Sequence, residues 1–429
     1  MPVREGRLER DGVRLHWVEW APSLPDEDDG VAIFALHGLS SNALFWRRLA
    51  ERLPHRRLVA LDQRAHGASD APATGYRMED VSEDARFAMQ ALELSRPVVL
   101  GHSWGGTVAL DLAATHTAEV SGLGLLDSPI QPLSGRLTWD QAAQLMQPPL
   151  PLYQALDEAY AESAAELGEA WGPDLEPFVA ASFRRDGDGW VRTLTAEVRV
   201  QILRALFGFQ PAVLFERVAE LPVLLALAGA DAGFRPWKEQ GARELKAALP
   251  DADVHWYDSG HDIPLILPAE VATGIERLCL RAAWREIARD AAALRGDWVA
   301  PAGTGEWSAK DLLAHLSSTQ AAMAPLLSVQ PRRVGAEPFD PDRWNASQVR
   351  KRKELPASQL LDELLRGSRD LDAALLTADL EAVMPAGSEA GRIVASAMRA
   401  MVRHQRGHLD ELRQALARAA GGSEKRRQS

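Results

Sequence analysis

A short apolar run that leads directly into a Gly-x-Ser-x-Gly motif is the feature that most limits how this chain can fold. Residues 97–100 are apolar and rich in β-branched side chains, residues 101–105 read Gly-His-Ser-Trp-Gly, and small helix-forming residues follow to about position 116. Strand, sharp turn and helix in this order form the setting of a nucleophile elbow, where a strained turn exposes a serine hydroxyl at the sheet edge. Glycine beside the turn lets the strand and the helix pass closely. The motif therefore predicts that Ser103 is a nucleophile.

The same alternation of strand and helix extends over the first two thirds of the chain. A hairpin is expected around Asp11 and Gly12, because Asp-Gly between alternating segments favours a tight turn. Short apolar runs then predict strands of a buried sheet, at residues 31–36, 57–61, 97–100, 122–126, 222–227 and 254–257. Helical stretches separate most of these runs, so we predict an α/β fold with a mostly parallel sheet covered on both faces.

This rhythm is interrupted between residues 129 and 217. The segment is helix-like, rich in Ala, Leu and aromatic residues, and broken by prolines. It is too long for a simple loop and shows no clear buried strand. We expect a helical cap over the carboxyl edge of the sheet.

A serine hydroxyl becomes a nucleophile only when a base takes its proton, and a third group must orient that base. His261 follows the last expected strand, and Asp231 follows the strand before it. We therefore predict a catalytic triad in which Ser103 attacks, His261 is the base and Asp231 orients it. Asp127 also ends a strand and remains the alternative for the acid.

Residues 1–280 resemble a capped α/β-hydrolase. The resemblance rests on landmarks in the family's order: His37-Gly38, the turn at 62–69, the elbow at 101–106, Gly229-Ala230-Asp231 and Gly260-His261. It implies an oxyanion hole formed by the backbone N–H groups of Leu39 and Trp104. The serine at the elbow excludes the aspartate nucleophile of similar dehalogenases and epoxide hydrolases. Cleavage of an ester, thioester, lactone, amide or activated C–C bond stays open, and no cofactor is expected for this domain.

A different pattern begins near residue 281. No further buried strand is indicated, and four amphipathic helical stretches lie at 281–294, 308–327, 355–376 and 391–420. They predict an all-α four-helix bundle over residues 281–420, followed by a disordered tail at 421–429. Ser308 and Asp311 have the spacing of a capping box at the start of the second helix.

Three histidines lie on helical stretches of this bundle. His404 and His408 are four residues apart and share one helix face, and His315 lies at the edge of the apolar face of another helix. Imidazoles four apart can bind one metal ion, and a third from a facing helix completes the set. The alternative is a histidine pair with a purely structural role.

Residues 281–420 resemble the DinB-like bundles, which include the N-terminal domain of mycothiol-dependent maleylpyruvate isomerase and related thiol transferases. The resemblance rests on residues 306–316, which contain His315, and on His-Gln-Arg-Gly-His at 404–408. It implies that His315, His404 and His408 bind a divalent metal, for which zinc, nickel and iron are all suitable. Asp311, one turn before His315, is a candidate partner for that histidine or a solvated surface residue.

Net charge and cysteine content limit the partners and the cellular compartment that we expect. The net charge is −12, which argues against a nucleic acid or an anionic membrane as the main partner. The single cysteine, Cys279, allows no intrachain disulfide and fits a reducing compartment. No signal peptide or membrane span is indicated. We therefore expect a cytoplasmic protein.

The function expected from these observations is that of a carboxylesterase-like serine hydrolase acting on a small acyl substrate, fused to a three-histidine metal bundle. Two alternatives stay open. In the first, the bundle carries the main activity as a metal-dependent thiol transferase or isomerase that uses a low-molecular-weight thiol. In the second, the bundle is a non-catalytic module for binding or for dimerisation. A dimerisation module would make the protein a homodimer.

Overall fold

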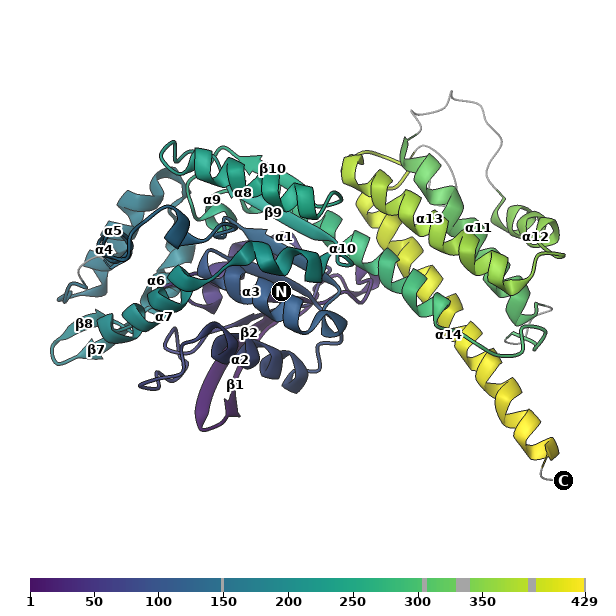
Figure 1. Cartoon of the computed structure of the whole chain (residues 1–429), viewed down its shortest axis with the longest axis horizontal. Helices are drawn as coiled ribbons and strands as arrows, with labels where there is room; N and C mark the ends of the chain where they lie inside the picture. Colours follow the sequence, from purple (N-terminus) through teal and green to yellow (C-terminus); the bar gives the residue numbers. More distant parts are fainter. Residues whose placement is uncertain (148–149, 303–306, 329–339, 385–390, 428–429) are drawn as a thin grey trace. The chain divides into compact units, whose positions relative to one another are not determined.

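A computed structural model of the chain describes residues 1–147, 150–302, 307–328, 340–384 and 391–427 (Figure 1). The chain divides into two compact units, Met1–Leu278 and Cys279–Ser429. Helix α10 (Pro268–Ala292) begins in the first unit and ends in the second. Each unit has its own core, so each is described by itself.

The first unit is built on an eight-stranded sheet with the order β1-β2-β4-β3-β5-β6-β9-β10. Strand β2 pairs antiparallel with β1 and β4, and all other neighbours pair in parallel. The strands are β1 (Val3–Arg10), β2 (Val13–Trp20), β3 (Ile33–Leu36), β4 (Leu58–Leu61), β5 (Val98–His102), β6 (Gly122–Leu126), β9 (Val223–Ala228) and β10 (Asp253–Tyr257). The predicted α/β class and the mostly parallel sheet are confirmed.

The first turn and the central strands follow from local chemistry. Asp11 and Gly12 have φ angles of 52° and 77°, as a tight hairpin turn between two twisted strands requires. Strands β3, β4, β5, β6 and β9 are buried along their whole length, which explains their continuous apolar sequences.

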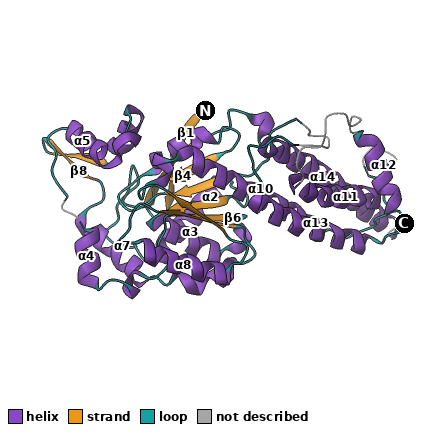
Figure 2. Cartoon of the chain, turned by 90° about the horizontal axis from the view of Figure 1, so that it is seen from above, coloured by secondary structure: helices purple, strands orange, loops and turns teal. Residues whose placement is uncertain are grey.

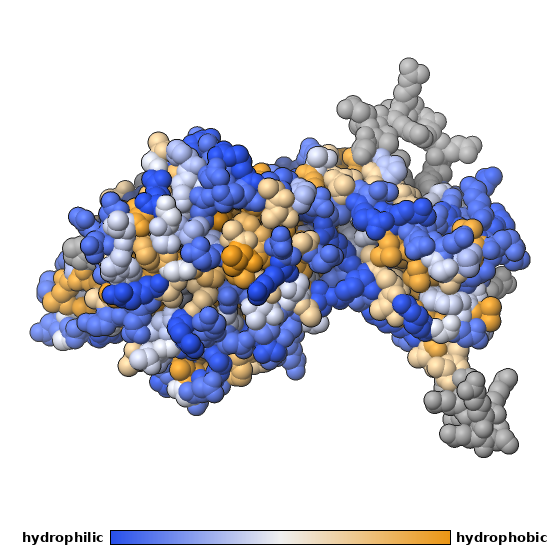
Figure 3. Space-filling view, viewed as in Figure 1, coloured by the Kyte–Doolittle hydropathy of each residue, from blue (hydrophilic) through white to orange (hydrophobic). Residues whose placement is uncertain are grey.

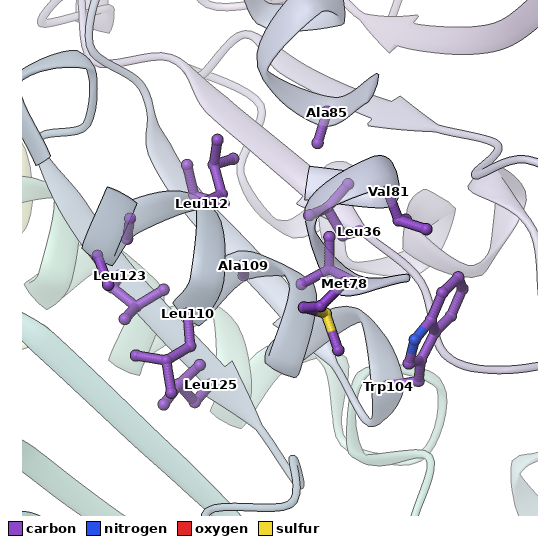
Figure 4. Packing of buried hydrophobic residues seen from close by; sticks show 14 of the residues in the cluster. Leu36, Met78, Val81, Ala85, Trp104, Ala109, Leu110, Leu112, Leu123 and Leu125 are labelled. Atoms are coloured by element: carbon purple, nitrogen blue, oxygen red, sulfur yellow. The ribbon is translucent and has the colours of Figure 1, made fainter. Parts of the chain in front are cut away.

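Helices cover the sheet and fix the position of β5 (Figure 2). They are α1 (Arg47–Arg52), α2 (Met78–Ala91), α3 (Trp104–Thr115), α8 (Arg235–Ala248), α9 (Ile263–Ile266) and the start of α10. Side chains of α2 and α3 share one apolar cluster with Leu36, Leu123 and Leu125 of the strands (Figure 4). Burial of each such leucine stabilises the fold by about 2 kcal/mol. The start of α3, where the elbow lies, is thus anchored in the core.

The segment between β6 and β9 forms the cap, which is mostly helical as predicted. Its helices are α4 (Trp139–Met146), α5 (Leu156–Leu167), α6 (Glu176–Ala180) and α7 (Ala196–Gly208). It also contains a hairpin that the sequence reading missed, formed by β7 (Phe183–Asp186) and β8 (Gly189–Arg192). These strands are only four residues long and mostly not buried, so they leave no apolar run.

Hydrogen bonds tie the cap to the loop after β3. Asn42 Nδ2 donates to the Phe178 carbonyl and to Ser182 Oγ, each at 2.8 Å. Arg48 forms an ion pair with Asp174, with Nε 2.7 Å from Oδ2. The cap is therefore fixed against the edge of the sheet where β3 ends.

The second unit is helical, as predicted. Its long helices are α10, α11 (Ala309–Ser328), α13 (Ala357–Thr377) and α14 (Val394–Arg427), and a shorter helix, α12 (Pro341–Lys351), was not expected. Buried leucines from α11, α13 and α14 form its core. Helix α14 includes residues 421–427, which the sequence reading assigned to a disordered tail, and residues 428–429 lie outside the described part.

Two polar features set the helix starts and contacts in this unit. The Ser308 hydroxyl accepts the N–H of Asp311 at 3.2 Å, and Asp311 Oδ2 accepts the N–H of Ser308 at 2.9 Å. The predicted capping box is confirmed. Arg281 and Arg285 both bind the carboxylate of Asp372, so α10 and α13 are joined by a largely buried ion pair.

A helix that crosses a membrane needs about 20 consecutive, mostly apolar residues. On the face shown in Figure 3, apolar residues occur in small groups among hydrophilic ones. Within the described residues, no single helix is both long and apolar enough to span a bilayer. The helix pair Ala196–Gly208 and Pro211–Val218, bent by 68°, reaches that length and apolarity only jointly.

Candidate functional site

Ser103 lies on a strained turn between β5 and α3. Its backbone has φ 52° and ψ −124°, a conformation that residues with side chains rarely adopt. A Cβ added to Gly101 would clash with the backbone of Gly105, and one added to Gly106 would clash with Ser128. Only glycine therefore permits this close packing of strand and helix. The elbow has the geometry that the motif predicted.

The carboxylate of Asp127 contacts the base His261. His261 Nδ1 lies 2.7 Å from Asp127 Oδ2, and the Asp127 side chain is only 1% exposed. Asp127 directly follows β6, the neighbour of the elbow strand, and its φ is 44°. The backbone N–H of Ala228 donates to Oδ1 at 2.9 Å, and Lys238 Nζ lies 2.7 Å from the same oxygen. Three donors thus hold this carboxylate in one orientation.

Asp231 is not the partner of His261, so the predicted pairing is wrong. Asp231 is exposed, and its Oδ1 accepts the backbone N–H groups of Gly233 at 2.9 Å and Phe234 at 3.2 Å. Its carboxylate thus fixes the turn before α8. Asp127, the alternative that the sequence left open, makes the contact with His261 that was predicted for Asp231.

The contacts of His261 and Asp127 determine in which direction the pKa of each is shifted. Desolvation alone would lower the pKa of His261, but the hydrogen bond and charge of Asp127 outweigh it, so the pKa is raised. Desolvation would raise the pKa of Asp127, but His261 and Lys238 outweigh it, so the pKa is lowered. Asp127 therefore stays ionised and accepts the Nδ1 proton. The other ring nitrogen of His261 is left to act as a base.

The loop after β3 approaches the elbow closely. A Cβ added to Gly38 would lie 3.0 Å from His102 Nδ1 and 3.1 Å from the Cβ of Ser103. Leu39 follows Gly38 in this loop, and Trp104 begins α3, where backbone N–H groups have no partner within the helix. Both predicted oxyanion donors thus belong to segments that border Ser103. Their role in catalysis stays a prediction.

Two buried histidines hold this loop in place. His37 Nε2 accepts the backbone N–H of Gln63 at 3.1 Å, and His66 Nε2 accepts that of Ser40 at 3.1 Å. Burial, together with the nearby His37, lowers the pKa of His66 to about 3. His66 is therefore neutral at physiological pH and can accept this hydrogen bond.

His102 of the elbow motif contacts the loop that carries His261. It is buried, its ring stacks on Phe45 with centroids 4.6 Å apart, and its Nε2 lies 3.0 Å from the carbonyl oxygen of His261. Burial and the adjacent His261 lower its pKa to about 4, so the neutral ring donates Nε2–H to that carbonyl. His102 thereby positions the loop that carries His261.

The second unit brings together the three histidines predicted to bind a metal. His315 comes from α11, and His404 and His408 come from α14. Each offers one ring nitrogen, and these nitrogens all lie within 4.8 Å of one another. His315 Nε2 and His404 Nε2 are 3.2 Å apart. Burial and the two other histidines lower the pKa of His315 to about 3.

The surroundings of this cluster fit a divalent metal. His408 Nδ1 lies 3.3 Å from Glu411 Oε2, so a carboxylate orients the ring and leaves Nε2 for the cluster. Three neutral imidazoles are a suitable donor set for zinc, nickel or iron. Asp311 does not support His315, because its carboxylate binds Ser308 at the start of α11.

Comparison with known proteins agrees with this division. Residues 280–413 match the family model of the mycothiol maleylpyruvate isomerase N-terminal domain. The thioesterase domain from the curacin biosynthetic pathway shares the fold of the first unit, with a TM-score of 0.54 and 18% identity over 64% of this chain and 99% of that one.

Two curated relatives show how far the similarity extends. Epoxide hydrolase 3 of Xenopus tropicalis is 34% identical over 126 residues, which are 29% of this chain and 33% of that protein. Lipase LipV of Mycobacterium tuberculosis is 32% identical over 166 residues, 38% of this chain and 58% of the lipase. The chain thus spans less than two thirds of either relative.

The match that covers most of the chain concerns the first unit. The family model described as alpha/beta hydrolase fold matches residues 31–266, more than half of the chain. This range includes Ser103 at the elbow and the contacting pair Asp127 and His261. The chain belongs to the alpha/beta hydrolase family, with a mycothiol maleylpyruvate isomerase N-terminal-type domain fused behind the hydrolase domain.

Proposed function

We propose that the first unit is a serine hydrolase that cleaves an ester, thioester or lactone through Ser103, His261 and Asp127. The observation that carries this proposal is the 2.7 Å contact between His261 Nδ1 and the buried Asp127 carboxylate, in a unit whose elbow holds Ser103 on a strained turn. A base oriented by a carboxylate beside a strained serine is the arrangement that acyl transfer requires.

In this proposal, His261 Nε2 takes the proton of Ser103 Oγ while Oγ attacks the acyl carbon. The backbone N–H groups of Leu39 and Trp104 bind the oxygen that becomes negatively charged. His261 then gives the proton to the leaving group, which departs and leaves an acyl group on Ser103. Water, activated by the same histidine, releases the acid.

The relatives include proteins named as a lipase and as epoxide hydrolases, so the reaction class needs an argument from this chain. The elbow carries a hydroxyl at position 103, not a carboxylate. An alkoxide formed with the help of His261 suits attack on an acyl carbon. This favours acyl-bond hydrolysis over epoxide opening.

The test is labelling of the purified protein with a fluorophosphonate, together with hydrolysis of a panel of 4-nitrophenyl esters. We expect wild type to be labelled and Ser103→Ala to lose both labelling and hydrolysis. A chelator should leave hydrolysis unchanged. If Ser103→Ala kept its labelling and its esterase activity, the proposal would be wrong.

We also propose that His315, His404 and His408 hold one divalent metal in the second unit. The convergence of three ring nitrogens within 4.8 Å supports this. A metal held by three histidines keeps open positions, where it could activate a bound thiol or water. A thiol transfer or isomerase reaction with a low-molecular-weight thiol is the second candidate function.

The metal proposal is tested by the metal content of the dialysed protein. We expect about one equivalent in wild type and in Ser103→Ala, and little in His404→Ala or His408→Ala. A wild-type protein that binds no metal when zinc, nickel or iron is added would contradict the proposal. The bundle would then be a binding or dimerisation module, and the mass of the protein in solution would show whether it forms a homodimer.

A further inference from the structure

Arg199 of the cap helix α7 reaches the loop that borders the elbow. Its Nη1 donates to Ser40 Oγ at 2.6 Å, and its Nε donates to the Met146 carbonyl at 2.7 Å. Ser40 directly follows Leu39, the proposed oxyanion donor. The guanidinium is half-buried between the cap and this loop, so it lies near the place where a scissile carbonyl would bind.

The charge of Arg199 is not neutralised by the described part of the chain. Both of its hydrogen bonds go to uncharged oxygens, and no described carboxylate forms an ion pair with it. Burial and the nearby Arg192 of β8 lower its pKa to about 10, so it remains a cation at physiological pH. The acidic neighbour Glu166 of α5 interacts with Arg192.

A partly buried charge without a counter-ion is costly, and arginine binds carboxylates through two parallel N–H groups. Among the described residues, Nη2 of Arg199 has no hydrogen-bond partner, so the guanidinium can accept a further ligand. That ligand should be an anion, because both hydrogen bonds of Arg199 within the described residues go to uncharged oxygens and leave its charge uncompensated.

We infer that Arg199 binds a carboxylate of the substrate, so that the hydrolase prefers acyl compounds that carry an additional carboxylate close to the scissile carbonyl. This inference rests on the proposed serine hydrolase function and names its substrate class. Water is consumed and an acid and an alcohol or thiol are released, as in the hydrolysis of an uncharged ester. The carboxylate takes no part in the bond changes.

A purely structural role for Arg199 predicts a different effect of its removal on the kinetics. If the arginine only held Ser40 and the oxyanion loop in place, its loss would slow all substrates equally. Selective loss on carboxylate-bearing substrates separates the two roles. Three variants are compared: Arg199→Met, Ser40→Ala and Arg204→Met. Ser40→Ala removes the hydroxyl that Arg199 binds but keeps the positive charge of Arg199. Arg204 lies exposed on the same helix over the ring of Trp139 and serves as the matched control.

Two esters with acyl chains of equal length supply the kinetic readout, 4-nitrophenyl butyrate and 4-nitrophenyl hemisuccinate. We expect wild type and Arg204→Met to prefer the hemisuccinate. Arg199→Met should lose about 10- to 100-fold more kcat/KM on the hemisuccinate than on the butyrate, mainly through KM, as expected for a charge-assisted hydrogen bond. Ser40→Ala should keep the wild-type preference. An unchanged ratio in Arg199→Met would overturn the inference.

Binding of succinate, measured by calorimetry, tests the inference without turnover. We expect Arg199→Met to bind succinate at least ten times more weakly than wild type and Arg204→Met. Equal binding by wild type and Arg199→Met, or none by wild type, would count against the inference. Failure of the fluorophosphonate to label Ser103 would instead overturn the proposed hydrolase function, so the two failures are distinguishable.

Discussion

Lys238 Nζ lies 2.7 Å from Oδ1 of Asp127, on the same carboxylate whose Oδ2 contacts His261 Nδ1 at 2.7 Å. Lys238 comes from α8 and also donates to the carbonyl of Ala228 at 3.0 Å. Its positive charge favours the ionised form of Asp127 and, in the opposite sense, lowers the pKa of His261. Asp127 thus contacts both Lys238 and His261. The lysine limits how far the carboxylate raises the pKa of His261.

Replacing Lys238 by methionine should raise the pKa of His261 further, because the remaining negative charge of Asp127 is no longer shared. A histidine base must be neutral to take a proton, so the acidic limb of the pH profile of kcat/KM should move to higher pH. Lys246→Met, on the same helix and bound to the Ala252 carbonyl, is the control. A profile that does not move in Lys238→Met would contradict this role.

The identity of the acid can be tested by a pair of conservative changes. Asp127→Asn should lower kcat by about 10³- to 10⁴-fold, because the amide favours the wrong tautomer of His261. Asp231→Asn should leave kcat within about 2-fold and change stability little, because an asparagine oxygen can accept the same two backbone N–H groups. Circular dichroism of both variants checks the fold. A large kcat effect confined to Asp231→Asn would contradict the assignment.

The choice between these two aspartates shows where reading the sequence fails. Both follow a predicted strand, and the strand assignment was correct for each. What decides between them is the direction of the side chain, which depends on the turn at Asp127 with φ 44° and on the hydrogen bond from Ala228. Lys238 and Asp127 are 111 residues apart in the sequence, so no local sequence pattern predicts their contact.

The fold could be predicted more completely than the site, because strands and helices leave local patterns in the sequence. Strands β3, β5 and β6 are buried along their length, so their apolar runs are continuous. The hairpin of β7 and β8 has short, exposed strands in the cap, where burial imposes no such pattern. His315, His404 and His408 were predicted from the helix face that two of them share and from the resemblance to the DinB-like bundles. Their convergence depends on packing of α11 against α14.

Acidification should destabilise the first unit through His66. Its pKa is lowered to about 3 in the folded state from an ordinary value of 6.5, because it is buried. Above pH 6.5 the ring is neutral in both states, and below it the unfolded chain takes up the proton first. Stability is therefore lost as the pH falls from 6.5 towards 3, with a cost of about 2 kcal/mol at pH 5 for this histidine.

Urea unfolding at pH 7.5 and pH 5 measures this effect when it is followed by tryptophan fluorescence, because nine of the thirteen tryptophans lie in the first unit. His66→Gln has no ring to protonate, so its loss of stability between the two pH values should be about 2 kcal/mol smaller than that of wild type. Comparing two pH values within each variant removes the effect of lost packing. Equal losses in wild type and His66→Gln would show that His66 is protonated in the folded state.

Glu411 provides a sharper test of the metal proposal than removal of a histidine, because it is not one of the three proposed ligands and its Oε2 lies 3.3 Å from His408 Nδ1. Glu411→Gln should keep all three histidines and weaken metal binding by about 10- to 100-fold, the usual effect of losing a carboxylate that orients a ligand. Asp311→Ala is the contrasting variant. Its carboxylate binds Ser308, so it should lower the stability of α11 by about 1 kcal/mol without changing metal affinity. Competition with a chelator of known affinity measures both variants, and a metal affinity that responds to Asp311 but not to Glu411 would contradict this arrangement.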